Sequence, residues 1–411
     1  MELLSLRFLI VTIMAKPRLL QISLSHRLVE FIIVLAGVVL LVLFFINIVL
    51  PYFLKTDYST LGSRDQMASA ETLEPPVAHM ETPEPLKAIY MTACVAGTPS
   101  WRESLKELIK TTELNAVVID IKDYTGTISF PNDFPKVSGG KGCVVSDMKE
   151  FVASLHADDI YVIGRISVFQ DLSYTQLFPE LAVKSKKTGG VWKDRKGIAF
   201  VDVGAKDYWK YILDISKASY ELGFDELNFD YIRYPSDGDM KDTNFTWTAG
   251  TSTKPEMLEG FFAHLAENLK GTGAKTSADL FGMTTTITND MGIGQVLERA
   301  LPYFDYVAPM VYPSHYPATW NGFANPASHP YEVIHIAMKA GRDREVVLNI
   351  SNGLATSTPS KLRPWLQDFD LGGDYGPAEV RAQMKATYDV GLTSWMLWSA
   401  ANKYTKEALL P

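Results

Sequence analysis

The stretch FDELNFD, residues 224–230, alternates in a way that decides the fold. Successive side chains of a strand point to opposite faces, so Leu227 and Phe229 share one face and Glu226, Asn228 and Asp230 the other. The apolar pair needs an apolar cover, which the helices around a parallel barrel provide. Asp230 should then face the interior at the carboxyl end of its strand, where barrel enzymes carry their chemistry. A buried acid paired with a neighbour for stability is the alternative.

Seven further runs of this kind alternate with amphipathic helical patterns. The eight expected strands are residues 88–92, 116–122, 160–167, 224–230, 276–281, 306–312, 362–367 and 394–398. Such alternation is typical of βα units and a parallel sheet. We therefore expect an α/β fold, a (β/α)₈ TIM barrel over residues 87–411, with long loops after the third, fourth and sixth strands. Residues 346–350 could also form a strand and are assigned to a helix.

The same alternation places further acids in the interior. Asp120 and Lys122 fall on the inward face of the second strand, and Asp279 on that of the fifth. Neighbouring strands lie about 4.8 Å apart, so carboxyl groups at adjacent strand ends can reach the roughly 5–5.5 Å separation of retaining glycosidases. Asp279 is therefore the preferred partner of Asp230. Two roles are possible for Asp120. It could act directly in catalysis, or it could pair with Lys122 or an arginine and so tune the charge of the site.

Other inward positions suit a sugar. A pyranose offers C–H faces for stacking on aromatic rings and hydroxyls that need fixed polar partners. Trp365 and Trp398 could equally fill the core. Asp368 has the outward parity of the seventh strand, which counts against it. The expected interior lining includes Tyr161, Arg165, Asn228, Tyr312, Trp365, Gln367 and Trp398.

Residues 31–50 read FIIVLAGVVLLVLFFINIVL. Twenty residues at a rise of about 1.5 Å span the roughly 30 Å of a bilayer core, so we expect one transmembrane helix over residues 31–54. A cleaved signal peptide is the alternative, but the bulky residues that follow do not suit cleavage. Basic residues precede the span, which predicts a cytoplasmic segment over residues 1–30 and an extracytoplasmic barrel. Residues 55–86, rich in Ser, Thr, Glu and Pro, are expected to form a disordered linker.

Composition excludes several functions. The formal charge of −8 over 411 residues, without a basic run, argues against a nucleic-acid partner. The seven histidines and two cysteines form no metal-binding motif, and the absence of a G-x-S-x-G elbow argues against the usual serine hydrolase. The glycine-containing segments at 271–276 and 292–294 do not complete a phosphate-loop or a dinucleotide motif. Neither a metal nor an organic cofactor is expected. Cys94 and Cys143 would follow strands on one face of the barrel and could pair in an oxidising exterior, although two free thiols are the more ordinary outcome.

From about Lys87 onward, the chain resembles a bacterial family of glycoside hydrolase-like domains of unknown function. The matching motifs are GFDELNFDYIRYP at 223–235, VIDIK at 118–122, SADLFG at 277–282, PMVYPSHY at 309–316, RPWLQDF at 363–369 and WMLW at 395–398. The resemblance implies a barrel related to the α-amylase and α-galactosidase groups, with a nucleophile at Asp230. The amylase group carries its acid on strand five, which is Asp279 here. The α-galactosidase group carries it on strand six, where this chain has Tyr312 and His315 and no carboxylate.

The sequence thus predicts a membrane-tethered glycoside hydrolase that acts on a cell-envelope or exported glycan. Asp230 would attack the anomeric carbon or stabilise positive charge there, and Asp279 would protonate the leaving oxygen. The residues expected to orient these groups or to bind the sugar are Asp120, Lys122, Arg165, Asn228, Arg233, Tyr312, His315, Trp365, Gln367 and Trp398. A barrel that binds envelope glycan without cleaving it, and a scaffold that holds partner proteins on its outer face, are the alternatives.

Overall fold

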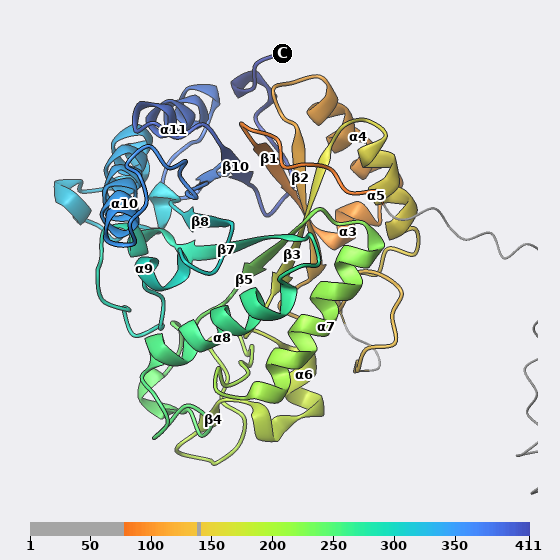
Figure 1. The fold of residues 1–411 in the computed structure, drawn as a ribbon, viewed down its shortest axis with the longest axis vertical. Coiled ribbons are helices and arrows are strands. Elements are labelled where there is room, and N and C mark those ends of the chain that lie inside the picture. The colour runs from red at the N-terminus through yellow and green to blue at the C-terminus, as the bar shows by residue number, and fades with distance from the viewer. Residues whose placement is uncertain (1–77, 138–140) are drawn as a thin grey trace, which may run out of the picture. The chain divides into compact units, whose positions relative to one another are not determined.

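The computed structural model describes residues 78–137 and 141–411. Eight parallel strands close into a barrel that is surrounded by helices (Figure 1). The first strand pairs with both the second and the last, which closes the cylinder. The barrel strands are β1 Lys87–Met91, β2 Ala116–Lys122, β3 Tyr161–Ser167, β5 Glu226–Asp230, β7 Lys275–Phe281, β8 Tyr306–Met310, β9 Trp365–Gln367 and β10 Trp395–Trp398. The expected barrel of eight parallel strands is confirmed.

Helices fill the connections between the strands. Residues 346–350 lie within the longest of them, so their assignment to a helix is confirmed. Glycine ends the helix before β5, because Gly223 adopts φ 128°, which other residues rarely reach. The α-helices are α3 Ala93–Ala96, α4 Pro99–Lys110, α5 Met148–His156, α6 Leu172–Leu177, α7 Lys206–Leu222, α8 Lys254–Leu269, α9 Leu297–Ala300, α10 Pro330–Ser351 and α11 Pro377–Asp389.

Long loops follow β3, β5 and β8, as the sequence predicts. The loops after β3 and β5 meet in a small antiparallel sheet of two strands, β4 Lys184–Ser185 and β6 Thr243–Asn244. The remaining short elements are the 3₁₀ helices η2 Pro179–Leu181, η3 Met240–Asp242, η4 Gly282–Thr285, η5 Pro313–His315, η6 Trp320–Gly322, η7 Pro326–Ser328 and η8 Lys406–Ala408. These loops build the rim of the barrel at the carboxyl ends of its strands.

Two apolar layers show which side chains face inward. Leu227 and Phe229 belong to the outer layer between strands and helices. Tyr161 and Trp365 belong to a separate inner cluster within the barrel. Glu226 is fully buried and pairs with Arg363, which lies two residues before β9. The alternation predicted for β5, with its polar set inward, is therefore confirmed.

The alternation fails at the end of β2. Asp120 pairs with Arg165, but Lys122 pairs with Ile166, so one extra residue is inserted as a bulge between them. Lys122 is turned away from the interior. Its Nζ lies 2.8 Å from Asp171 Oδ2 and 2.6 Å from the Ser167 carbonyl oxygen. The expectation that Lys122 faces the interior beside Asp120 is wrong, because the bulge reverses the parity of the last residue.

The loops after β1 and β2 are joined by a disulfide. Cys94 in α3 bonds Cys143, which lies in the loop after β2. The two strands are neighbours, so the loops that follow them lie side by side and the cysteines come within reach. The preference for two free thiols is therefore wrong, and the pairing left open by the sequence is the one that forms.

Residues 78–86, the last part of the expected linker, lie across the amino end of the barrel. The Met80 amide donates to Asp225 Oδ1 at 2.7 Å, and the Leu86 amide donates to Ser394 Oγ at 2.8 Å. The hydroxyls of Thr82 and Tyr161 are 2.9 Å apart. The expected transmembrane helix lies outside the described residues. Within residues 78–137 and 141–411, no helix is long and apolar enough to cross a membrane.

Candidate active site

A cavity of about 340 Å³ opens at the carboxyl ends of the strands. Its size lies within the roughly 300–1,000 Å³ typical of small-molecule sites. Of the side chains that the structure describes, Asp230 is the one carboxylate in the cavity wall. The lining comprises Arg165, Asp230, Tyr231, Arg233, Phe281, Gly282, Met283, Met310, Tyr312, His315, Tyr316 and Trp398.

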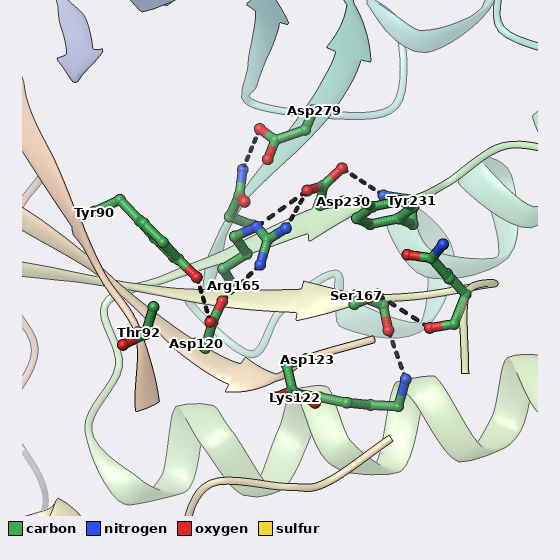
Figure 2. A network of polar contacts seen from close by, with 12 residues as sticks. Tyr90, Thr92, Asp120, Lys122, Asp123, Arg165, Ser167, Asp230, Tyr231 and Asp279 are labelled. Carbon is green, nitrogen blue, oxygen red and sulfur yellow. Dashed lines mark hydrogen bonds and ion pairs between the residues drawn. The ribbon is translucent and has the colours of Figure 1, made fainter. Parts of the chain in front are cut away.

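Asp230 is held by Arg165 from the neighbouring strand. Arg165 Nε donates to Asp230 Oδ2 at 3.1 Å, and Nη2 donates to the same oxygen. Asp230 Oδ1 accepts the amide hydrogen of Tyr231 at 2.5 Å. Figure 2 shows Arg165 between Asp230 and Asp120, with Lys122 apart from them. The carboxylate therefore has one fixed orientation at the cavity wall.

Asp120 lies behind Arg165 and does not line the cavity. Its Oδ1 accepts from Arg165 Nη1 at 2.6 Å, and its Oδ2 accepts from the Tyr90 hydroxyl at 2.5 Å. Burial raises the pKa of Asp120, while Arg165 and Tyr90 oppose that effect. Both oxygens of Asp120 are thus engaged in holding Arg165 and Tyr90 in place.

Asp279 lies on β7, the strand next to Asp230. Phe229 pairs with Ala278, which brings the following residues, Asp230 and Asp279, to the same level of the barrel. Asp279 Oδ1 accepts from Asn228 Nδ2 at 2.9 Å and from Trp365 Nε1 at 2.8 Å. Burial, and then the negative charge of Asp230, raise the pKa of Asp279 to about 8. Asp279 is buried and is not part of the cavity wall.

Aromatic side chains form much of the cavity wall. Tyr312, His315 and Trp398 line it, where the sequence predicts sugar contacts. Burial lowers the pKa of His315, which favours a neutral imidazole. Tyr90 stacks on Trp398 with ring centres 4.0 Å apart and fixes that ring from behind. The wall is therefore apolar with a few charged groups, as a sugar site requires.

Sequence reasoning missed several members of this site. Phe281 is inward by alternation, a signal that was available, and it lines the cavity. Tyr90 is likewise on the inward face of β1, in the inner cluster. Tyr231 and Tyr316 lie beyond the ends of their strands, where alternation no longer applies, and Tyr231 adopts φ 51°.

Three expected binding residues lie behind the wall instead of in it. Trp365 and Asn228 donate their side-chain hydrogen bonds to Asp279, as described above. Gln367 accepts from the Ser314 amide at 3.1 Å and donates to the Phe369 carbonyl at 2.9 Å, so it shapes the loop that carries His315. Asp368 accepts from the amide and hydroxyl of Thr405 and stays outside the cavity, as its parity predicts. The described residues contain no group of three or more side chains suited to a metal.

Residues 88–404 match the model of a family described as "Putative glycosyl hydrolase domain". The chain belongs to this family. The match covers nearly the whole barrel and includes every residue discussed for the cavity. The prediction of a glycosyl hydrolase domain is thereby confirmed at the level of the family. No curated protein sequence matches the chain significantly.

Solved structures resemble this glycosyl hydrolase domain to different extents. A hypothetical protein from Ruminiclostridium thermocellum is 34% identical over 46% of this chain and 96% of its own, with a TM-score of 0.42. The glycoside hydrolase domain of PgaB (BpsB) from Bordetella bronchiseptica is 17% identical over 77% of this chain and 94% of its own, with a TM-score of 0.54. α-L-Fucosidase isoenzyme 2 from Paenibacillus thiaminolyticus is 10% identical over 79% of this chain and 48% of its own, with a TM-score of 0.53. The latter two share the fold.

Proposed function

We propose that this chain hydrolyses a glycosidic bond with Asp230 and Asp279 as its two catalytic carboxyl groups. The observation that carries the proposal is that these two carboxyl groups, on adjacent strands, have different surroundings. Asp230 lies at the cavity wall in an ion pair with Arg165, whereas Asp279 is buried on the adjacent strand with its pKa raised to about 8. One carboxyl group held in an ion pair and a second whose raised pKa keeps its proton at neutral pH suit the two roles of glycoside hydrolysis.

In the proposed reaction, an Asp230 oxygen attacks the anomeric carbon while the glycosidic C–O bond breaks. The leaving oxygen receives the proton of Asp279 through one bridging water, because Asp279 lies behind the cavity wall, and a glycosyl ester of Asp230 forms. Water then attacks the anomeric carbon, gives a proton to the Asp279 carboxylate and releases Asp230. Asp279 Oδ1 already accepts two hydrogen bonds, so Oδ2 is the oxygen suited to carry the proton. Asp120 is a positioning residue that acts through Arg165.

The substrate we propose is a glycan of the cell envelope, bound against Trp398 and Tyr312. We retain the proposal of a cytoplasmic segment over residues 1–30, a transmembrane helix over residues 31–54 and a linker that leads to an extracytoplasmic barrel. The disulfide between Cys94 and Cys143 supports the extracytoplasmic placement, because such bonds persist mainly in oxidising compartments. PgaB, whose glycoside hydrolase domain shares the fold, supports the general class of reaction.

The test is Asp230→Asn in the purified full-length chain, assayed on a panel of envelope polysaccharides. The variant loses the nucleophile but keeps the shape of the side chain, so hydrolysis should fall at least about 10³-fold with an unchanged unfolding temperature. The matched control is Asp239→Asn, in the same loop, whose carboxylate pairs with exposed Lys187. The control should keep the wild-type rate. Hydrolysis by Asp230→Asn at the wild-type rate would remove Asp230 from the mechanism. NMR of the first product released by the wild type gives the anomeric configuration of that product.

A barrel that binds glycan without cleaving it is the second candidate. The observation in its favour is that Asp279 does not reach the cavity wall. It predicts binding to an envelope glycan without release of products by the wild-type protein at any pH. The scaffold alternative required an occluded barrel mouth, whereas a cavity opens there.

A further inference from the structure

Arg233 is a buried cation in the cavity wall that the proposed reaction does not use. It lies three residues after β5 and is 8% exposed. Its guanidinium carbon is 4.8 Å from the ring centre of Phe281, 5.0 Å from that of Tyr231 and 5.8 Å from that of Phe200, so three aromatic rings surround the group. Arg233 also lines a second cavity of about 800 Å³, and Tyr231 is the other residue common to both.

The hydrogen bonds of Arg233 leave one edge of the guanidinium free. Nη1 donates to the Tyr234 carbonyl oxygen at 3.0 Å and to Ser236 Oγ at 3.2 Å. Nε and Nη2 have no hydrogen-bond partner among the described residues. Neither nitrogen is fully buried, so both remain accessible to a ligand. These two nitrogens form the edge that binds a carboxylate through two parallel hydrogen bonds.

No described carboxylate forms an ion pair with Arg233, in contrast to the other buried arginines of the barrel. Arg165 pairs with Asp120 and Asp230, and Arg363 pairs with Glu226. Asp230 and Asp194 attract Arg233 only from beyond ion-pair distance. Buried cations are normally paired with an acidic group, and Arg233 lacks a described one, so a negatively charged group of a ligand in the cavity would complete its interactions.

We propose that Arg233 binds a carboxylate of the substrate, so that the glycan recognised at this site carries an acidic sugar of the uronic type. The inference rests on the proposed function for the identity of the ligand as a glycan. Two cavities that meet at Arg233 and Tyr231 allow a chain longer than one sugar to pass the guanidinium. The acidic sugar would lie next to the unit whose anomeric carbon faces Asp230.

The test measures binding of three probes, D-glucuronate, D-glucose and D-glucose 6-sulfate, to the full-length protein by ligand-detected NMR. Wild-type protein should bind glucuronate about tenfold or more tightly than glucose, because a charge-assisted pair of hydrogen bonds is added. Arg233→Gln should abolish that preference. Arg195→Gln is the matched control, because Arg195 is an exposed arginine paired with Asp237, and it should keep the preference.

Arg233→Lys provides a second variant should Arg233→Gln fail to fold. A lysine keeps the charge but not the two-pronged edge, so most of the preference for glucuronate should still be lost. Equal binding of glucuronate and glucose by the wild type, or a preference that persists in both Arg233 variants, would overturn the proposal. Selective binding of the sulfate ester would overturn the assignment to a carboxylate. Since only binding is scored, a glucuronate preference without hydrolysis would contradict the proposed function alone.

Discussion

Single residues set the chemistry of the cavity through what surrounds them. Asp230 and Asp279 are the same residue type at the same level of adjacent strands. Arg165 binds Asp230 with two N–H groups, whereas Asp279 receives neutral donors from Asn228 and Trp365. Neutral donors compensate burial less than a guanidinium does, so the proton is retained on Asp279. The roles that we propose for the two acids rest on this difference in contacts.

Hydrolysis should therefore depend on pH in a specific direction. Burial and Asp230 raise the pKa of Asp279 to about 8, so Asp279 is protonated below that pH and can donate to the leaving oxygen. We expect kcat/KM to fall as the pH rises through about 8, measured as a pH–rate profile of the full-length chain. Asp279→Asn, which keeps an oxygen for Asn228 and Trp365, should lower kcat/KM at every pH, and its residual activity should lack this alkaline limb. A rate that stays constant up to pH 10 would exclude Asp279 as the acid.

At the scale of single elements, β3 shows how tightly the outer layer is packed. Gly164 faces outward beneath two large apolar side chains of neighbouring segments, Ile121 and Phe224. A Cβ atom at Gly164 would lie 2.9 Å from Phe224 Cδ1 and closer still to the side chain of Ile121. Ile121 and Phe224 are fully buried and have little room to move. The packing of Ile121 and Phe224 over β3 thus depends on the absence of a side chain at Gly164.

Gly164→Ala should lower the free energy of unfolding by about 1–3 kcal/mol through overpacking. Gly260→Ala in α8 is the matched control, because its Cβ would meet Trp209 at an ordinary 3.6 Å. In a helix interior that substitution should be neutral or stabilising by up to about 1 kcal/mol. Urea unfolding followed by circular dichroism measures both. If the Gly164→Ala protein is as stable as the control, the side chains packed over β3 can move enough to accept a methyl group, and the prediction is wrong.

The rim and the amino end of the whole barrel are fastened by contacts distant in sequence. The disulfide joins positions separated by 49 residues and connects the loops after β1 and β2. At the opposite end, residues 78–86 bind β3, β5 and β10 or the residues just before them. The first and last strands are thus held together by more than their own ladder.

Replacing both cysteines should destabilise the molecule without changing the lining of the cavity that contains Asp230. Cys94→Ser with Cys143→Ser frees a long loop in the unfolded state, which should cost about 2–4 kcal/mol of unfolding free energy. The wild type treated with a reductant should show a similar loss, while the double variant should be insensitive to the reductant. Thermal unfolding with and without reductant measures both. Equal stability of the double variant and the oxidised wild type would mean that packing alone orders the rim.

The sequence by itself determined the architecture and the inward face of the strands. Eight strands and the inward placement of Asp230, Asp279 and Arg165 follow from two periodicities that are local properties of the chain. The helix over residues 346–350 follows only from the strand count, because a barrel of eight strands leaves no place for a ninth. The family motifs lie on these same strands and loops.

Only the tertiary structure decided which inward residues reach the cavity. A single inserted residue in β2 turns Lys122 away from the interior. Trp365 and Gln367 form hydrogen bonds with residues of other strands and loops and therefore do not line the cavity. The disulfide, the free edge of Arg233 and the protonation of Asp279 depend on neighbours far away in sequence. Periodicity reports the face on which a side chain lies. Burial, partners and charge at that face are set by segments that come together only when the barrel closes.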